Sequence, residues 1–446
     1  MAGYDPPAMS PLQRRAALVL LLLTWVLCFG QGLVKGVTPK SDGQLYCRIA
    51  ENLRLDGRYR LVREGPRAEL PYAGYEPLHP LFIAVADGLG GKWGYLAAAS
   101  ALVALGMGAW FMAFREWLGP ASRLPYLIWA LLLWPTPMYL HARWYRREPL
   151  VCLLTALTAL LLTRVWRSNR RRDAVAASLC WGLAILAKSV WLVFLPLLPL
   201  IWWRGGKPMS RCLLALAACA AAVAPWAVRN RLVMPSPVLV SSLGSLSFLN
   251  NNVHGLDPWL TTHPEVYPKD MLTYCQDEGA SDRECYRRKL AVVAKEPMLA
   301  LRICAVNLLE FIYPLMGPHF PRDPDEPVHF HPTLIFAYAG MLMALLAGGF
   351  RLPRADSALW IPAGMVAAYL AVCMLWIGMA LYRAPVEPLI LGMGIWGWAR
   401  WSGGRAGRVR ITALAYALAW GASFALTTEL RRPVIGWLCT LIGRIA

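Results

Sequence analysis

Long apolar runs separated by short polar stretches dominate the chain. They cover residues 16–34, 93–114, 124–140, 149–165, 174–187, 190–203, 212–228, 332–350, 357–380, 385–399 and 411–428. About 20 apolar residues cross the hydrocarbon core of a bilayer, and the shorter runs would need a thinned or protein-lined membrane. The pattern predicts an all-α polytopic membrane protein with a bundle of about eleven transmembrane helices.

Composition supports a membrane protein and excludes other classes. The chain is 57% hydrophobic and 16% charged, whereas soluble domains are about 25% charged. The 45 Lys and Arg against 26 Asp and Glu give a net charge of +19, but the basic residues form short clusters between apolar runs rather than one solvated patch. We therefore expect no nucleic-acid partner. Intrinsic disorder is excluded by the apolar content, and a disulfide scaffold by eleven Cys in 446 residues.

The distribution of arginines predicts the orientation. Short basic loops at 115–123, 164–173, 204–211, 351–356 and 400–410 lie on one side if the spans alternate. The positive-inside rule places them and the N-terminus in the cytoplasm, with the protein in the plasma (inner) membrane. The first run is about 19 residues long, longer than the roughly 7 to 15 of a signal-peptide core, so we interpret it as a retained span.

Two hydrophilic outer segments divide the chain. The expected units are 1–34 (tail and first span), 35–92 (outer), 93–228 (bundle), 229–331 (outer) and 332–446 (C-terminal spans). The spacing predicts an amphipathic helix at 42–55, an interfacial piece at 78–89 and a capped helix at 281–297. Residues 298–313 form an interfacial helix or a twelfth span; we reject the span because it would move six later arginines outside. Cys275 and Cys285 are a plausible disulfide pair.

Ionisable residues at the outer ends of spans are the candidate chemistry, because such groups are costly in lipid. Asp42 follows the first span and is either a general base or a helix cap. The turn His141–Glu148 carries Arg146 and Arg147, and is either a ligand site or an interfacial anchor. Three further cations, Lys188, Arg229 and Arg383, lie on the same side. Guanidinium groups donate paired hydrogen bonds to phosphate, so these cations suggest a phosphate ligand.

Five segments in order carry a family resemblance. They are Thr38–Tyr46, Gly74–Leu81 (GYEPLHPL), Gly182–Lys188 (GLAILAK), Ala224–Asn230 (APWAVRN) and Leu381–Pro388 (LYRAPVEP). Together they resemble the GT-C superfamily of integral-membrane glycosyltransferases, in its protein-mannosyltransferase-like and lipid-A-modifying (aminoarabinose and galacturonose) branch. The last segment is similar to an Arg-Tyr-Arg-x-Pro motif, with Leu381 in place of the first arginine. The resemblance covers about residues 16 to 400.

The resemblance implies an inverting glycosyltransferase that takes its sugar from a polyprenyl-phosphate donor on the outer face. Its acceptor would be a lipid, a glycan or a protein. Asp42 matches the base of the family, with Glu76 in reserve. The donor phosphate would meet Lys188, Arg383, Arg229, Arg146 and Arg147. Substrate contacts are expected from Tyr46, Glu148, His79, Asn250 and Tyr382. Physically, such cations stabilise the negative charge that develops on a departing phosphate.

No cofactor is indicated and no metal ligand is assigned. The acid after the first span in this family is commonly followed by a second acid, but Gly43 follows Asp42 here. A divalent ion therefore stays an open question, because one carboxylate binds it poorly. The run Asp323–Glu326 has a DxD shape but is more often simply solvated, and His329 with His331 makes a weak zinc candidate.

Two other classes stay open at this point: a polyprenyl-linked lipid transporter or flippase, and a membrane assembly subunit without catalysis. Most charged residues lie at span ends rather than at mid-membrane, which favours the enzyme. Replacing Asp42 by Asn separates the three classes. An enzyme would lose turnover and keep donor binding, a transporter would change in flux, and a scaffold would be unaffected.

Overall fold

The structure is a computed structural model of the 446-residue chain. It describes residues 9–40, 42–62, 72–119, 122–133, 137–204, 206, 208–234, 238–241, 287, 290–291, 294–295, 297–312, 315–316, 329–330, 358, 360–375 and 380–402. The predicted spans 332–350 and 411–428, the acids at 323–326 and the Cys275–Cys285 pair lie outside these residues.

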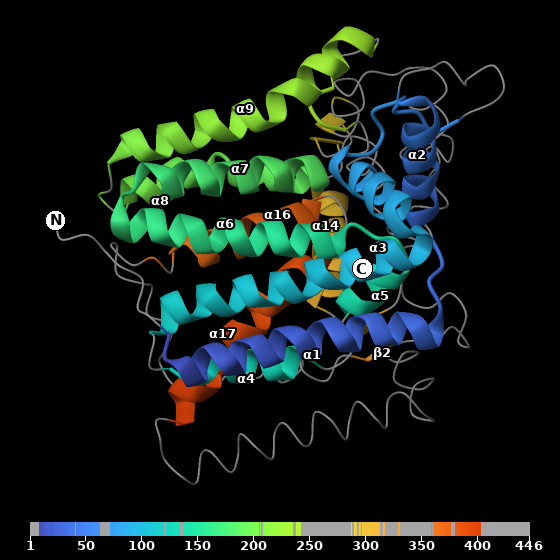
Figure 1. The fold of residues 1–446 in the computed structure, drawn as a ribbon. Helices are drawn as coiled ribbons and strands as arrows, with labels where there is room; N and C mark the ends of the chain where they lie inside the picture. The colour runs from blue at the N-terminus through green and yellow to red at the C-terminus, as the bar shows by residue number, and fades with distance from the viewer. Residues whose placement is uncertain are drawn as a thin grey trace.

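Five helices lie side by side across the bundle (Figure 1). They are α1 (Pro11–Lys35), α3 (Leu78–Leu118), α6 (Glu148–Ser168), α7 (Arg171–Ala187) and α9 (Met209–Val233). Each packs against the next in the order α1, α3, α6, α7, α9. Helices α14 (Pro297–Ile312), α16 (Trp360–Leu375) and α17 (Glu387–Ser402) complete the core from the other side.

Most of the apolar runs within the described residues form single helices, so the all-α polytopic class is confirmed. Four of the described helices, α1, α3, α6 and α9, are long and apolar enough to cross a membrane. The first begins with a capping box in which Ser10 and Gln13 satisfy each other's backbone amides. Among the described residues, strand structure is limited to the antiparallel pair β1 (Leu315–Met316) and β2 (His329–Phe330).

Two of the predicted spans are broken in the structure. The run 124–140 becomes α4 (Leu124–Leu132) and α5 (Pro137–Arg143), and the run 190–203 becomes the 3-10 helix η1 (Ser189–Phe194) and α8 (Leu197–Arg204). Proline removes a backbone donor and clashes with the preceding turn. Pro196 lies at the second interruption, so hydropathy alone joined pieces there that proline separates.

The first outer segment contains the predicted amphipathic helix. It is α2 (Asp42–Asp56), which packs against α3 at one end of the bundle (Figure 1). Within α3 the backbone leaves helical geometry at Gly90 and Gly91. This kink separates the predicted interfacial piece from the span that follows it, and it places α2 and the start of α3 together.

Buried charges join α3 to α6 at the opposite end of the bundle. The Glu116 carboxylate accepts from Arg167 at 3.0 Å and from Arg164 at 3.5 Å. A carboxylate excluded from water needs such partners. The basic loops predicted to face the cytoplasm begin at these residues.

The kink in α3 generates a stability prediction. Gly91 has φ +57° and ψ −153°, a region that only glycine occupies easily, and a Cβ built on it would meet open space. Gly91→Ala should therefore cost about 1 to 3 kcal/mol through backbone strain alone. Thermal unfolding in detergent should show a lowered melting temperature, whereas Gly88→Ala, at a helical position with ordinary contacts, should not. Equal melting temperatures for the two variants would contradict the kink.

Candidate active site

Backbone contacts of the residues between α1 and α2 determine the position of Asp42. Backbone hydrogen bonds run from the Thr38 amide to the Arg143 carbonyl (3.1 Å) and from the Lys40 amide to the Trp144 carbonyl (3.4 Å). The first outer segment is thereby paired with the turn that joins α5 to α6. As a result the start of α2 lies directly against this cationic turn.

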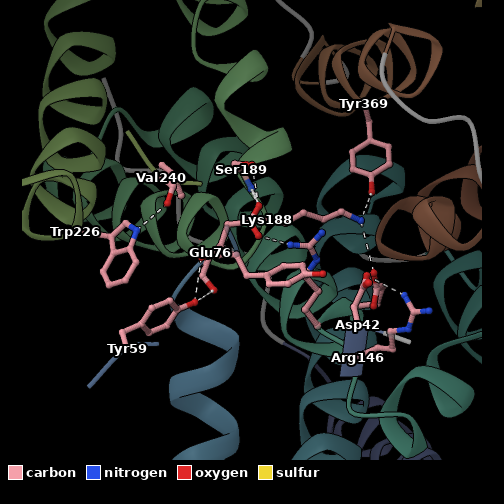
Figure 2. Close-up of polar contacts among 12 residues, drawn as sticks. Asp42, Tyr59, Glu76, Arg146, Lys188, Ser189, Trp226, Val240 and Tyr369 are labelled. Atoms are coloured by element: carbon pink, nitrogen blue, oxygen red, sulfur yellow. Dashed lines mark hydrogen bonds and ion pairs between the residues drawn. The ribbon is translucent and has the colours of Figure 1, made fainter. Parts of the chain in front are cut away.

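Asp42 and Arg146 form an ion pair across this contact. The Arg146 Nη1 atom lies 3.4 Å from the Asp42 Oδ2 atom, and the Asp42 side chain keeps 28% of its surface exposed. Figure 2 shows the two side chains facing one another. Asp42 is therefore both charge-paired and accessible to a small molecule.

The Glu76 carboxylate is buried and surrounded by hydrogen-bond donors. Its carboxylate accepts from Arg147, which is equally buried, and from the amide and hydroxyl of Ser189 at 2.8 Å each (Figure 2). The Arg147 guanidinium also lies over the Tyr46 ring, 5.9 Å from its centroid. Glu76 thus joins the segment before α3, the α5–α6 turn and η1.

Lys188 ends α7 and lies among polar groups of three other elements. Its ammonium donates to the Tyr369 hydroxyl of α16 at 3.2 Å and lies 3.7 Å from the Glu148 Oε1 atom at the start of α6 (Figure 2). The other Glu148 oxygen lies 3.4 Å from the His141 Nδ1 atom of α5. Lys188 is 3% exposed, so its charge depends on these neighbours.

Tyr46 contributes a buried hydroxyl one turn along α2 from Asp42. Burial raises its pKa well above the ordinary value, so the group stays a neutral donor. Among the described residues this hydroxyl has no hydrogen-bond partner. His79 packs edge-on to the ring at 5.0 Å, and its Nε2 atom lies 2.9 Å from the Tyr145 carbonyl oxygen. A buried donor without a partner is costly, which makes Tyr46 a candidate to bind a ligand.

Arg229 lies at the end of α9 in an aromatic setting. Its guanidinium stacks on Trp226 (4.7 Å) and Tyr59 (5.6 Å) and donates to the carbonyl oxygens of Tyr72 (2.8 Å) and Tyr59 (3.3 Å). The indole of Trp226 in turn donates to the Val240 carbonyl at 2.8 Å (Figure 2). Arg229 therefore joins Tyr59, which follows α2, and Tyr72, which precedes α3, to α9.

Arg383 is fully buried in the 3-10 helix η2 (Ala380–Val386). It donates to Glu387 at 3.0 Å and to the Phe311 carbonyl of α14. The Phe311 ring packs 6.3 Å from Tyr369, the partner of Lys188. Tyr382 belongs to the same helix, but its side chain lies outside the described residues, as does Asn250.

The structure thus gathers Asp42, Tyr46, Glu76, Arg146, Arg147, Glu148 and Lys188 at one end of the bundle. Two members were missed from the sequence, Ser189 and Tyr369. Ser189 adjoins Lys188, and Tyr369 carries a hydroxyl inside an otherwise apolar run; these were the signals available in the sequence.

A cavity of about 310 Å³ adjoins the site, lined by Pro39, Cys47, Asp87 and Tyr145 among others. Burial raises the pKa of Cys47 to about 12, which disfavours its thiolate form.

The described residues contain no group of three or more His, Cys, Asp and Glu side chains placed to hold a metal ion. The two histidines of the site lie in the network already described, against the Tyr145 carbonyl and Glu148.

The arrangement defines a polytopic membrane protein with a paired acid–cation site at the end of its bundle. The solved structures that follow share the fold of this chain, in agreement with the GT-C fold expected from the sequence. The oligosaccharyltransferase AglB from Archaeoglobus fulgidus, in complex with an inhibitory peptide and a dolichol-phosphate, matches with a TM-score of 0.53 and 14% identity over 93% of this chain. The same enzyme in complex with Zn and sulfate matches with a TM-score of 0.52 and 15% identity over 92%.

The chain spans little more than half of AglB, 56% and 53% of its length in the two structures. ArnT from Cupriavidus metallidurans bound to undecaprenyl phosphate matches with a TM-score of 0.38 and 17% identity, over 85% of this chain and 77% of ArnT. No protein-family model and no curated protein matches the sequence.

The buried ion pair between Glu76 and Arg147 generates the second prediction. Removing one partner of a buried ion pair strands the other charge, so Glu76→Ala should destabilise the protein by about 3 to 5 kcal/mol. The double variant Glu76→Ala with Arg147→Met should lose less than the two single variants combined. Thermal unfolding of the three variants measures this, with the exposed Glu51→Ala as control. Strictly additive losses would show that the pair does not exist.

Proposed function

We propose that the protein is an integral-membrane glycosyltransferase that moves a sugar from a polyprenyl-phosphate donor to an acceptor hydroxyl on the outer face. The observation that carries this proposal is the meeting of an accessible carboxylate, Asp42, with buried cations from separate elements at one end of the bundle. The fold shared with AglB supports it, because that enzyme is described in complex with dolichol-phosphate.

Asp42 is the proposed general base. The acceptor oxygen attacks the anomeric carbon from the face opposite the phosphate while its proton passes to the Asp42 carboxylate. The bond from the anomeric carbon to the phosphate oxygen breaks, and the polyprenyl phosphate leaves with the electron pair. A single displacement of this kind inverts the anomeric centre. The reaction needs a base that a substrate can reach, and Asp42 is the partly exposed acid of the network.

Lys188 and Arg383 are the proposed ligands of the donor phosphate. The Lys188 ammonium and the Tyr369 hydroxyl lie within hydrogen-bond distance and would offer adjacent donors. Arg383 is linked to the same place through Phe311, which accepts from Arg383 and packs on Tyr369. Positive groups fixed in a buried site stabilise the charge that a departing phosphate gains, without rearranging during the reaction.

The other predicted residues receive supporting roles. Tyr46, His79 and Glu148 would contact the sugar or acceptor, as would Tyr382 and Asn250. We assign Arg147 and Glu76 to positioning, because Glu76 is enclosed by its partners. Arg229 likewise holds the segment between α2 and α3, since its guanidinium is engaged by backbone oxygens and aromatic rings.

The orientation and domain limits are proposals as well. The segments 35–92 and 229–331 would face outward, with the N-terminus in the cytoplasm. The charge distribution supports this, because the arginine-rich turn between α6 and α7 lies at the opposite end of these helices from Glu148 and Lys188.

Transfer activity is the test of the function. We expect the purified protein in nanodiscs to transfer label from one member of a panel of polyprenyl-phosphate sugars to a membrane extract. Asp42→Asn should reduce turnover by about 100-fold or more, the range typical for loss of a general base, with donor affinity unchanged. The matched control is Asp56→Asn at the far end of the same helix.

Lys188→Met should instead weaken donor binding, because it removes a charge that faces the phosphate. Donor binding that is unaffected by both substitutions, with no transfer in any case, would favour the assembly-subunit class. Donor flux across liposomes without transfer would favour the flippase.

A further inference from the structure

The residue after Asp42 has no room for a side chain. A Cβ built on Gly43 would collide with the carbonyl oxygen of Trp144. This oxygen belongs to the backbone and accepts from the Lys40 amide, so it cannot swing aside as a side chain would. Glycine is required here by the close approach of two chain segments. A second carboxylate beside Asp42 is therefore sterically excluded at this position.

The close approach of these two chain segments also places Arg146 beside Asp42. Tyr145 adopts a left-handed conformation with φ +58°, and the Arg146 amide closes the turn by donating to the His141 carbonyl at 3.0 Å. The turn then directs the guanidinium to within 3.4 Å of Asp42, with 12% of the Arg146 side chain exposed. A left-handed tyrosine is uncommon and indicates that the turn is held by its surroundings.

The surroundings of Asp42 do not fit a divalent cation. Such an ion takes six or more oxygen ligands, and in a protein site one or more of them are usually carboxylates. The described residues provide no group of three acid, histidine or cysteine side chains that could hold a metal ion. At position 43 a carboxylate side chain is excluded, because it would collide with the Trp144 carbonyl oxygen. Lys40 adds a further positive charge two residues before Asp42, with its ammonium 5.2 Å from the ring centroid of Trp144. Like charges would repel an incoming metal ion.

We propose that Arg146 takes the place of a divalent cation beside Asp42. It is a positioning residue: its guanidinium fixes the orientation of the carboxylate and balances its charge, so that turnover needs no added metal. The proposal rests on the proposed function, in that Asp42 is the base. It differs from the expectation that Arg146 binds the donor phosphate, because its observed partner is the acid.

Two measurements on the full-length protein in nanodiscs test the proposal. The first needs no turnover: Mn²⁺ is titrated and followed by electron paramagnetic resonance. The wild-type protein should show no stoichiometric binding at millimolar concentration. Stoichiometric Mn²⁺ binding that Asp42→Asn abolishes would overturn the proposal, whether or not any sugar is transferred.

The second measurement is steady-state kinetics of Arg146→Ala. We expect kcat to fall by about 100-fold, as for a disabled general base, with the donor KM unchanged. Methylguanidine should restore part of the rate and Mn²⁺ should not, while Arg146→Lys should keep more activity than the alanine variant. The control is Arg48→Ala, an exposed arginine of α2, the helix that begins at Asp42.

Two kinetic outcomes would overturn the proposal. A raised donor KM with unchanged kcat would make Arg146 a phosphate ligand. Loss of wild-type activity in EDTA, restored by Mn²⁺ or Mg²⁺, would make the enzyme metal-dependent. If the wild-type protein transfers no sugar from any donor, the proposed function fails, and the Mn²⁺ titration still decides whether Asp42 lies in a metal site.

Discussion

The buried ion pair between Glu76 and Arg147 is the interaction on which the site depends. It joins three segments distant in the sequence: the chain entering α3, the turn entering α6, and η1, whose Ser189 donates twice to the same carboxylate. Burying either charge alone would cost several kcal/mol. Because Arg147 is held this way, the neighbouring Arg146 is fixed toward Asp42, and Glu148 at the start of α6 is fixed toward Lys188.

Charge pairing runs through the whole site. Each candidate acid has a basic partner: Asp42 has Arg146, Glu76 has Arg147 and Glu148 has Lys188. Glu387, which was not a candidate, pairs with Arg383 in the same way. Such pairing is what burial demands, since unpaired charges are not tolerated away from water. It also shapes binding, because an anionic phosphate must compete with a carboxylate for its cation. A donor can then displace an internal partner rather than fill an empty positive pocket.

The helices and the charges at the ends of the apolar runs could be predicted from the sequence, because hydropathy, helix spacing and arginine-rich loops are local signals. The partners of those charges could not. Arg229 and Lys188 look alike in sequence, each at the end of an apolar run, yet one stacks on Trp226 and the other meets Tyr369 and Glu148. In the sequence, Gly43 is notable only because it stands where the family commonly has a second acid. The structure gives the physical reason, because a side chain at this position would collide with the Trp144 carbonyl oxygen. Pro196 lies where the apolar run 190–203 breaks, a signal that hydropathy does not register.

A structure of the full-length protein in nanodiscs with a non-transferable polyprenyl-phosphate sugar analogue tests the central claim most directly. We expect the phosphate beside Lys188, with the anomeric carbon on the side that faces Asp42. Phosphate bound at the opposite end of the bundle, beside Glu116 and its arginines, would contradict it. So would an anomeric carbon placed where no acceptor could lie between it and Asp42.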